Sequence, residues 1–271
     1  MKISFIHLIY DSQQSDNSGK ISGLISCTCS CLIIVCLFLF CACANTDKTA
    51  RANDTITAVY TSEAMTIDGI LSEKIWQKTQ FILLLNNKTG NGISEKADQT
   101  KVRTCFNDSC FYIFFECNDA DIWGHYTERD QHLWEEEAVE VFIDTDDERY
   151  NYIEIEVSPR NVLFDSYIID PQNIDIAATK TFDLPGIQTS VFVKGTLENR
   201  DDKDESWNVE IAIPFSDLNN REKYASPDSL WRINFYRINR DRNKEPAGYA
   251  WSPTFGRFHK PSAFGVLKFA E

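Results

Sequence analysis

Rings and carboxylates alternate with aliphatic side chains in residues 131–157, QHLWEEEAVEVFIDTDDERYNYIEIEV. In the first run, residues 138–144, Glu140 lies on the same set of alternate positions as Phe142 and Asp144. Valine or isoleucine fills the other set. In the second run, Tyr152, Glu154 and Glu156 alternate with isoleucine and valine. Alternation of this kind is typical of β-strands that bury one apolar face, so we expect the face with rings and acids to be exposed. Rings pack on C–H faces and carboxylates accept hydrogen bonds from hydroxyls, which suits a sugar ligand.

Two tryptophans extend this candidate site. Trp134 stands at the entrance of the first run, beside three consecutive glutamates, and is expected to face the ligand. Trp123, with Tyr126, lies in the preceding loop and would widen the site. The structural alternatives are a Trp134 that packs at the rim of the domain and a Glu140 that is merely solvated.

The turn between the two runs could hold a metal. Asp144, Asp146 and Asp147 supply clustered carboxylate oxygens, the ligands that calcium prefers, so a structural calcium ion is one interpretation. Their spacing does not match an EF-hand loop, and a solvated acidic turn is the favoured alternative. No other cofactor is expected.

The elements that must position these residues are short strands. Alternating apolar runs separated by Asn, Asp, Gly or Pro predict an all-β fold, an antiparallel two-sheet β-sandwich of the jelly-roll type. Short helices are expected at residues 72–79 and after Pro214. The predicted strands cover residues 56–60, 81–85, 101–106, 111–117, 138–144, 152–157, 162–167, 187–193, 207–213, 231–238 and 265–269.

An uncharged apolar segment over residues 21–44 precedes the predicted domain and predicts export. Its end, Leu39-Phe40-Cys41-Ala42-Cys43, resembles a bacterial lipoprotein signal box and makes Cys43 the candidate lipidation site. An uncleaved membrane helix and an ordinary cleaved signal are the alternatives. We therefore divide the chain into a signal or anchor (1–43), a polar tether (44–55) and a folded domain (56–271) on the outer membrane or cell surface.

Three of the nine cysteines, Cys105, Cys110 and Cys117, lie in the predicted domain. An odd number excludes a complete disulfide framework. Cys105 and Cys110 flank a turn and could form a disulfide in an oxidising compartment, and free thiols are the equal alternative.

The formal net charge of −14 belongs to the predicted domain, because the two lysines and two aspartates before Cys43 cancel. This charge disfavours nucleic acid and anionic membrane surfaces as ligands. It permits neutral glycans and divalent cations.

Five segments resemble, in order and spacing, carbohydrate-binding module family 9 and its DOMON-like relatives, which are β-sandwiches. The resemblance covers essentially the whole predicted domain. The segments are Ile67–Gly69 with Glu73 and Trp76, Lys101-Val102 followed by Phe111–Ile113, Trp134 through Asp144, Trp207–Pro214, and Trp251–Pro253 with Phe258–Gly265.

The resemblance implies a site in which two rings hold a terminal sugar and a carboxylate binds its hydroxyls. Trp134 falls on the position of the first ring, Phe258 on that of the second, and Glu140 on that of the carboxylate. A family arginine falls near Glu154 or Glu156, so the chain departs from the pattern there, and His259 would supply a replacement contact. The implied function is a non-catalytic carbohydrate-binding module that supports carbohydrate catabolism at the cell surface.

Three other classes of function were compared with this one. A surface sandwich that binds a partner protein, for instance within a glycan-uptake complex, is the main alternative. Haem binding lacks the usual ligand supply, since Met65 is the only methionine after Met1. A glycosidase needs two carboxylates at a set separation, and the sequence has no Gly-x-Ser-x-Gly, HExxH or phosphate loop.

Overall fold

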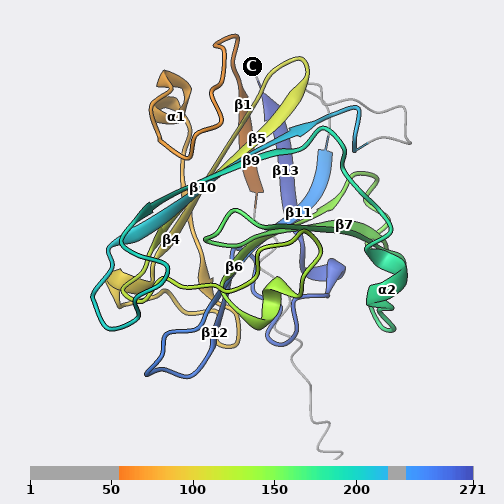
Figure 1. The fold of residues 1–271 in the computed structure, drawn as a ribbon. Coiled ribbons are helices and arrows are strands. Elements are labelled where there is room, and N and C mark those ends of the chain that lie inside the picture. The colour runs from red at the N-terminus through yellow and green to blue at the C-terminus, as the bar shows by residue number, and fades with distance from the viewer. Residues whose placement is uncertain (1–54, 219–229, 271) are drawn as a thin grey trace, which may run out of the picture. The chain divides into compact units, whose positions relative to one another are not determined.

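Thirteen strands, two short α-helices and three 3-10 turns make up the described residues, 55–218 and 230–270, of the computed structural model (Figure 1). The helices are α1 (Lys74–Lys78) and α2 (Ile176–Thr179), and the 3-10 turns are η1 (Lys96–Asp98), η2 (Leu133–Glu135) and η3 (Pro261–Ala263). The strands are β1 (Thr55–Tyr60), β2 (Ile82–Leu83), β3 (Leu85–Asn86), β4 (Thr100–Phe106), β5 (Cys110–Asn118), β6 (Ala138–Asp144), β7 (Tyr152–Val157), β8 (Leu163–Ile168), β9 (Gln188–Lys194), β10 (Ser206–Pro214), β11 (Leu230–Asn239), β12 (Ala247–Ala250) and β13 (Gly265–Ala270).

The all-β prediction is confirmed, but the prediction of two separate antiparallel sheets is wrong. The strands form one continuous sheet in the order β8-β7-β6-β11-β13-β1-β4-β5-β10-β9. Most neighbours are antiparallel, whereas β1 runs parallel to both β13 and β4. Parallel neighbours need a crossover connection. Residues 61–99, which include α1, β2 and β3, provide it between β1 and β4.

The sheet folds over on itself around one apolar core. Strands β6, β7, β11 and β13 supply one wall, and β1, β4, β5 and β10 supply the other. Rings meet between the walls, with the Phe115 and Phe235 centroids 5.9 Å apart and those of Phe111 and Trp231 6.0 Å apart. The valines and isoleucines of β6 and β7 all lie in this core, so their predicted apolar face is confirmed.

The opposite face of β6 and β7 is not exposed, contrary to the sequence prediction. Every residue of both strands is buried, including Glu140, Glu154 and Glu156. Side chains from the segment that precedes and begins α2, and from the loop before η3, lie over this face. Alternation could show which residues share a face, but it could not show that later segments return to cover it.

Most predicted elements are present. Strands β6 and β7 have the predicted bounds, and α1 lies within the predicted helix at residues 72–79. Residues 215–218 form a turn rather than the helix expected after Pro214. Strand β12 and helix α2 were not predicted, because each is four residues long and carries little periodic signal.

Cys105, Cys110 and Cys117 are free thiols. The sequence left a Cys105–Cys110 disulfide and free thiols as equal alternatives, and the structure has free thiols. Burial raises the pKa of the Cys117 thiol to about 12, so this group stays protonated at neutral pH.

The predicted signal or anchor, including Cys43, and the tether before Thr55 lie outside the described residues. Among the residues that the structure does describe, none of the helices has the length and apolar character needed to span a bilayer.

Candidate functional site

A cavity of about 300 Å³ lies on the face of β6 and β7 that points away from the apolar core. Apolar side chains form its walls and acids form part of its lining. The lining residues are Trp134, Glu140, Glu154, Glu156, Ile174, Ile176, Ile238, Phe258 and His259.

Strand register brings the three acids together. Glu140 on β6 pairs directly with Glu156 on β7, and Glu154 is two residues before Glu156 on the same face. The three side chains can place carboxylate oxygens within 4.8 Å of one another. Ser166 on β8, the register partner of Glu154, donates a hydrogen bond to Glu154 Oε2 at 3.1 Å.

All three carboxyl groups have raised pKa values. Burial raises the pKa of Glu154 from 4.5 to about 7, although hydrogen bonds with Ser166 and Glu156 act in the opposite direction. Burial is also the largest cause for Glu140 and Glu156, whose pKa values lie well above the ordinary value, and neighbouring carboxylates add to the effect. Ionising all three groups together is therefore unfavourable unless a positive charge enters the cavity.

Trp134 is half-buried at the cavity edge and is held on two sides. Its ring stacks on His132, with centroids 4.5 Å apart and planes 18° apart, and its edge packs against Phe164. The Trp134 carbonyl accepts a hydrogen bond from Arg240 Nη2 at 2.9 Å. The rim packing considered from sequence is thus present, and the ring still lines the cavity.

Phe258 lines the same cavity from the loop before η3. It stacks on Tyr236 of β11, with centroids 4.2 Å apart and planes 17° apart. The Tyr236 hydroxyl donates to the Phe258 carbonyl at 3.0 Å and fixes the backbone there. Gly248 on β12 makes room for the ring, since a Cβ at that position would lie 3.0 Å from Phe258 Cζ.

His259 is a neutral member of the lining. Burial and the positive charge of Arg257 lower the pKa of His259 to about 4. Its Nδ1 lies 2.6 Å from the Tyr152 hydroxyl, and its ring stacks on Phe142. Its Nε2 is 3.9 Å from Glu154 Oε1. Tyr152 is itself buried and does not line the cavity, so it positions His259 rather than facing a ligand.

Trp123 is placed away from the cavity. Its indole N–H donates to the Arg240 carbonyl at 2.9 Å, and the Arg200 guanidinium lies over its ring at 4.3 Å. Trp123 is not among the residues that line the cavity. Of the predicted sugar-binding residues, the structure brings together Trp134, Glu140, Glu154, Phe258 and His259.

The acidic turn after β6 already uses its carboxylates within the protein. Asp144 Oδ1 accepts from the Asp146 N–H and Asp144 Oδ2 from the Arg149 N–H. Asp147 Oδ1 lies 2.7 Å from Arg232 Nε. The structural calcium ion considered at this turn stays a prediction.

Four residues that line the cavity were not among the predicted site residues. Register makes Glu156 a direct neighbour of Glu140, and the pairing of the two strands could have identified it. Ile174 and Ile176 belong to a segment with no periodic pattern, and Ile238 lies at the end of β11. No sequence signal identifies these three as lining residues.

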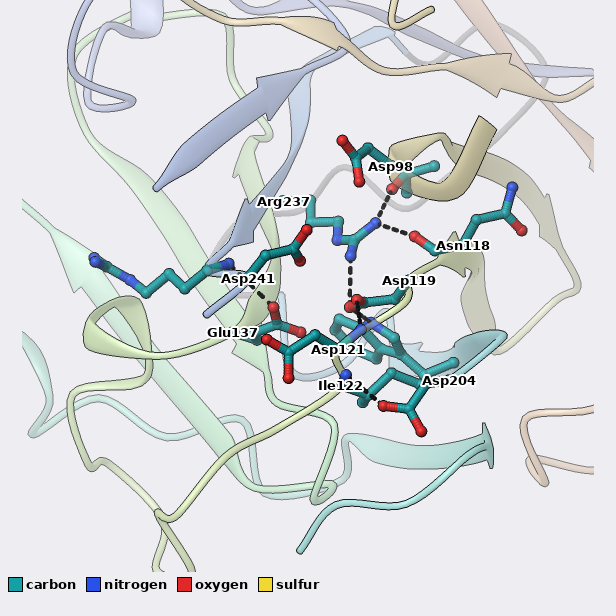
Figure 2. Close-up of polar contacts among 12 residues, drawn as sticks. Asp98, Asn118, Asp119, Asp121, Ile122, Glu137, Asp204, Arg237 and Asp241 are labelled. Carbon is teal, nitrogen blue, oxygen red and sulfur yellow. Dashed lines mark hydrogen bonds and ion pairs between the residues drawn. The ribbon is translucent and has the colours of Figure 1, made fainter. Parts of the chain in front are cut away.

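A second group of buried charges has a structural role (Figure 2). Arg237 is wholly buried and donates to Asp119 Oδ2 at 2.7 Å and to the Asn118 carbonyl at 2.8 Å. Glu137 and Asp241 lie close to Asp119. Arg237 forms an ion pair with Asp119, and Lys244 forms one with Asp241.

The fold and the site define a class, an all-β domain with a cavity lined by aromatic and acidic side chains. The sequence model described as carbohydrate-binding family 9 matches residues 93–269, and the chain belongs to this family of non-catalytic domains.

The chain is also similar to three known proteins. The chain is 28% identical over 183 residues to a protein of Arthroderma benhamiae named "Extracellular protein", covering 63% of this chain and 78% of that one. A candidate carbohydrate-binding protein of Bacteroides uniformis shares the fold with a TM-score of 0.63 and 17% identity, over 80% of this chain and 99% of that one. A family 9 module of Caldicellulosiruptor kristjanssonii in complex with cellotriose has a TM-score of 0.55 and 16% identity, over 80% of this chain and 93% of that one.

Proposed function

We propose that this chain is a non-catalytic carbohydrate-binding module that holds a terminal sugar residue of a glycan in the cavity on β6 and β7. One observation carries the proposal: Trp134, Glu140, Glu154, Phe258 and His259 line one cavity, although they come from distant parts of the chain. Membership of carbohydrate-binding family 9 supports it, as do the related structures with cellotriose and glucose.

The geometry suits a sugar-ring ligand. Trp134 stacks on His132 and Phe258 stacks on Tyr236, and both rings line the cavity, where they can pack on the C–H faces of a sugar. A ring that covers a sugar face removes about 50 Å² of C–H surface from water, worth roughly 1 kcal/mol. With a few hydrogen bonds to charged groups, binding would reach about −4 to −7 kcal/mol, or millimolar to micromolar affinity.

The direct test is Trp134→Ala. We expect this variant to lose retention on polysaccharide affinity gels, because one of the two rings is gone, while its far-UV circular dichroism spectrum shows that it is folded. Phe192→Ala is the matched control, since Phe192 is 38% exposed on the edge strand β9 and lies outside the cavity. Unchanged retention of Trp134→Ala would remove Trp134 from the site.

We further propose export, with membrane attachment through lipidated Cys43 or an N-terminal helix and a role in carbohydrate catabolism, as part of a surface glycan-uptake complex. The apolar segment over residues 21–44 supports export and attachment, and the Arthroderma benhamiae relative named "Extracellular protein" supports export. Membrane fractionation of the wild type and of Cys43→Ser tests the lipid anchor. If Cys43 carries the lipid, we expect the variant to be lost from the membrane fraction.

A further inference from the structure

The cavity presents three acids without a basic partner. Glu140, Glu154 and Glu156 are 2%, 4% and 1% exposed, and their carboxylate oxygens converge within 4.8 Å. No lysine or arginine among residues 55–218 and 230–270 forms an ion pair with any of them. His259 is the one imidazole near them, and it is neutral at physiological pH because burial lowers its pKa to about 4.

One carboxyl oxygen of this group also lacks a hydrogen-bond partner. Glu156 Oε2 is buried and has no hydrogen-bond partner among the described residues. A buried carboxylate oxygen without a donor is unfavourable. The structure therefore leaves room for a donor that arrives with the ligand.

The remaining walls of the cavity are apolar. Trp134 and Phe258 supply rings, and Ile174, Ile176 and Ile238 supply aliphatic surface. A bare metal ion would use the acids and leave these walls without a partner. A neutral sugar would use the walls and its hydroxyls, and would bring no positive charge to the acids.

We propose that the preferred ligand is a sugar residue with a free amino group, a hexosamine, whose ammonium group sits against Glu140, Glu154 and Glu156 while its ring lies along Trp134 and Phe258. An ammonium group has three N–H donors and a positive charge, which match three carboxyl groups and the unpartnered Glu156 oxygen. The inference rests on the proposed function, because it names the sugar class for the same cavity.

The test compares three sugars of similar size by isothermal titration calorimetry on the full-length protein at one pH and ionic strength. Glucosamine carries a positive charge, whereas glucose and N-acetylglucosamine do not. We expect glucosamine to bind at least tenfold more tightly than the other two. Glu156→Gln should remove most of this preference for glucosamine, whereas Glu198→Gln, which changes an exposed acid outside the cavity, should leave the preference and the glucose affinity unchanged.

The outcomes separate this inference from the proposed function. Equal affinity for glucosamine and glucose would overturn the amino-sugar inference and leave sugar binding intact. If glucose binding requires calcium and is lost with a chelator, the amino-sugar inference would be overturned in favour of a metal-bridged ligand. If a wide glycan panel shows no binding at all, the proposed function fails as well. Because the comparison of sugars uses the wild type, it holds even if Glu156→Gln does not fold.

Discussion

Glu154 links the ligand cavity to the pH dependence of stability. Its pKa rises from 4.5 to about 7 on folding, so the folded protein keeps a proton that the unfolded chain releases. Stability from this group is present below pH 4.5 and is lost as the pH rises through 7. His259 acts in the opposite sense, since its pKa falls to about 4, and its contribution is present above pH 6.5 and lost as the pH falls.

Replacing Glu154 with Gln should make stability less dependent on pH. The amide keeps the shape and cannot ionise, so we expect Glu154→Gln to gain stability relative to the wild type as the pH rises from 5 to 8, by on the order of 1–3 kcal/mol. Urea denaturation at several pH values measures this difference. Glu198→Gln is the control, and a Glu154→Gln difference that does not change with pH would contradict the prediction.

Among the elements, β5 and β11 are joined by a buried ion pair. Asp119, which directly follows β5, accepts hydrogen bonds from Arg237 of β11 and from the Trp207 indole N–H of β10. Both charged side chains are fully buried. Removing one partner of such a pair leaves an uncompensated charge in the interior.

Asp119→Ala should therefore be strongly destabilising. We expect a loss of about 3–5 kcal/mol in the free energy of unfolding. Glu198→Ala, which removes an exposed partner of Arg160, should cost less than about 1 kcal/mol. Chemical denaturation of both variants checks the contrast, and similar values for the two would show that the buried pair contributes little.

The elements also show how far sequence could predict the site. Alternation in residues 138–144 and 152–157 predicted both strands and the face that carries the acids. Alternation could not predict that the segment around Ile174 and the loop at Phe258 would cover this face. Neither segment has a periodic pattern of apolar residues, and the position of each depends on long-range packing. For the same reason the acids were expected in solvent, when they are buried around a cavity.

At the scale of the whole molecule, the sequence predicted the fold class but not the sheet order. Turn residues and period-two runs mark strands locally. The parallel placement of β1 between β13 and β4 depends on contacts between the first and last strands of the domain, which no local pattern records. The order of family segments added information because it reflects the complete fold, and membership of carbohydrate-binding family 9 is confirmed.

The position of β1 has a consequence for how the chain acquires its structure during synthesis. Its ladder with β13 extends over five residue pairs, from Thr55↔Val266 to Val59↔Ala270, whereas its ladder with β4 has only two. Closing a contact between such distant residues carries a large entropic penalty, and the ribosome delivers β13 after all the other strands. The longer ladder that holds β1 can therefore form only after β13 has been synthesised.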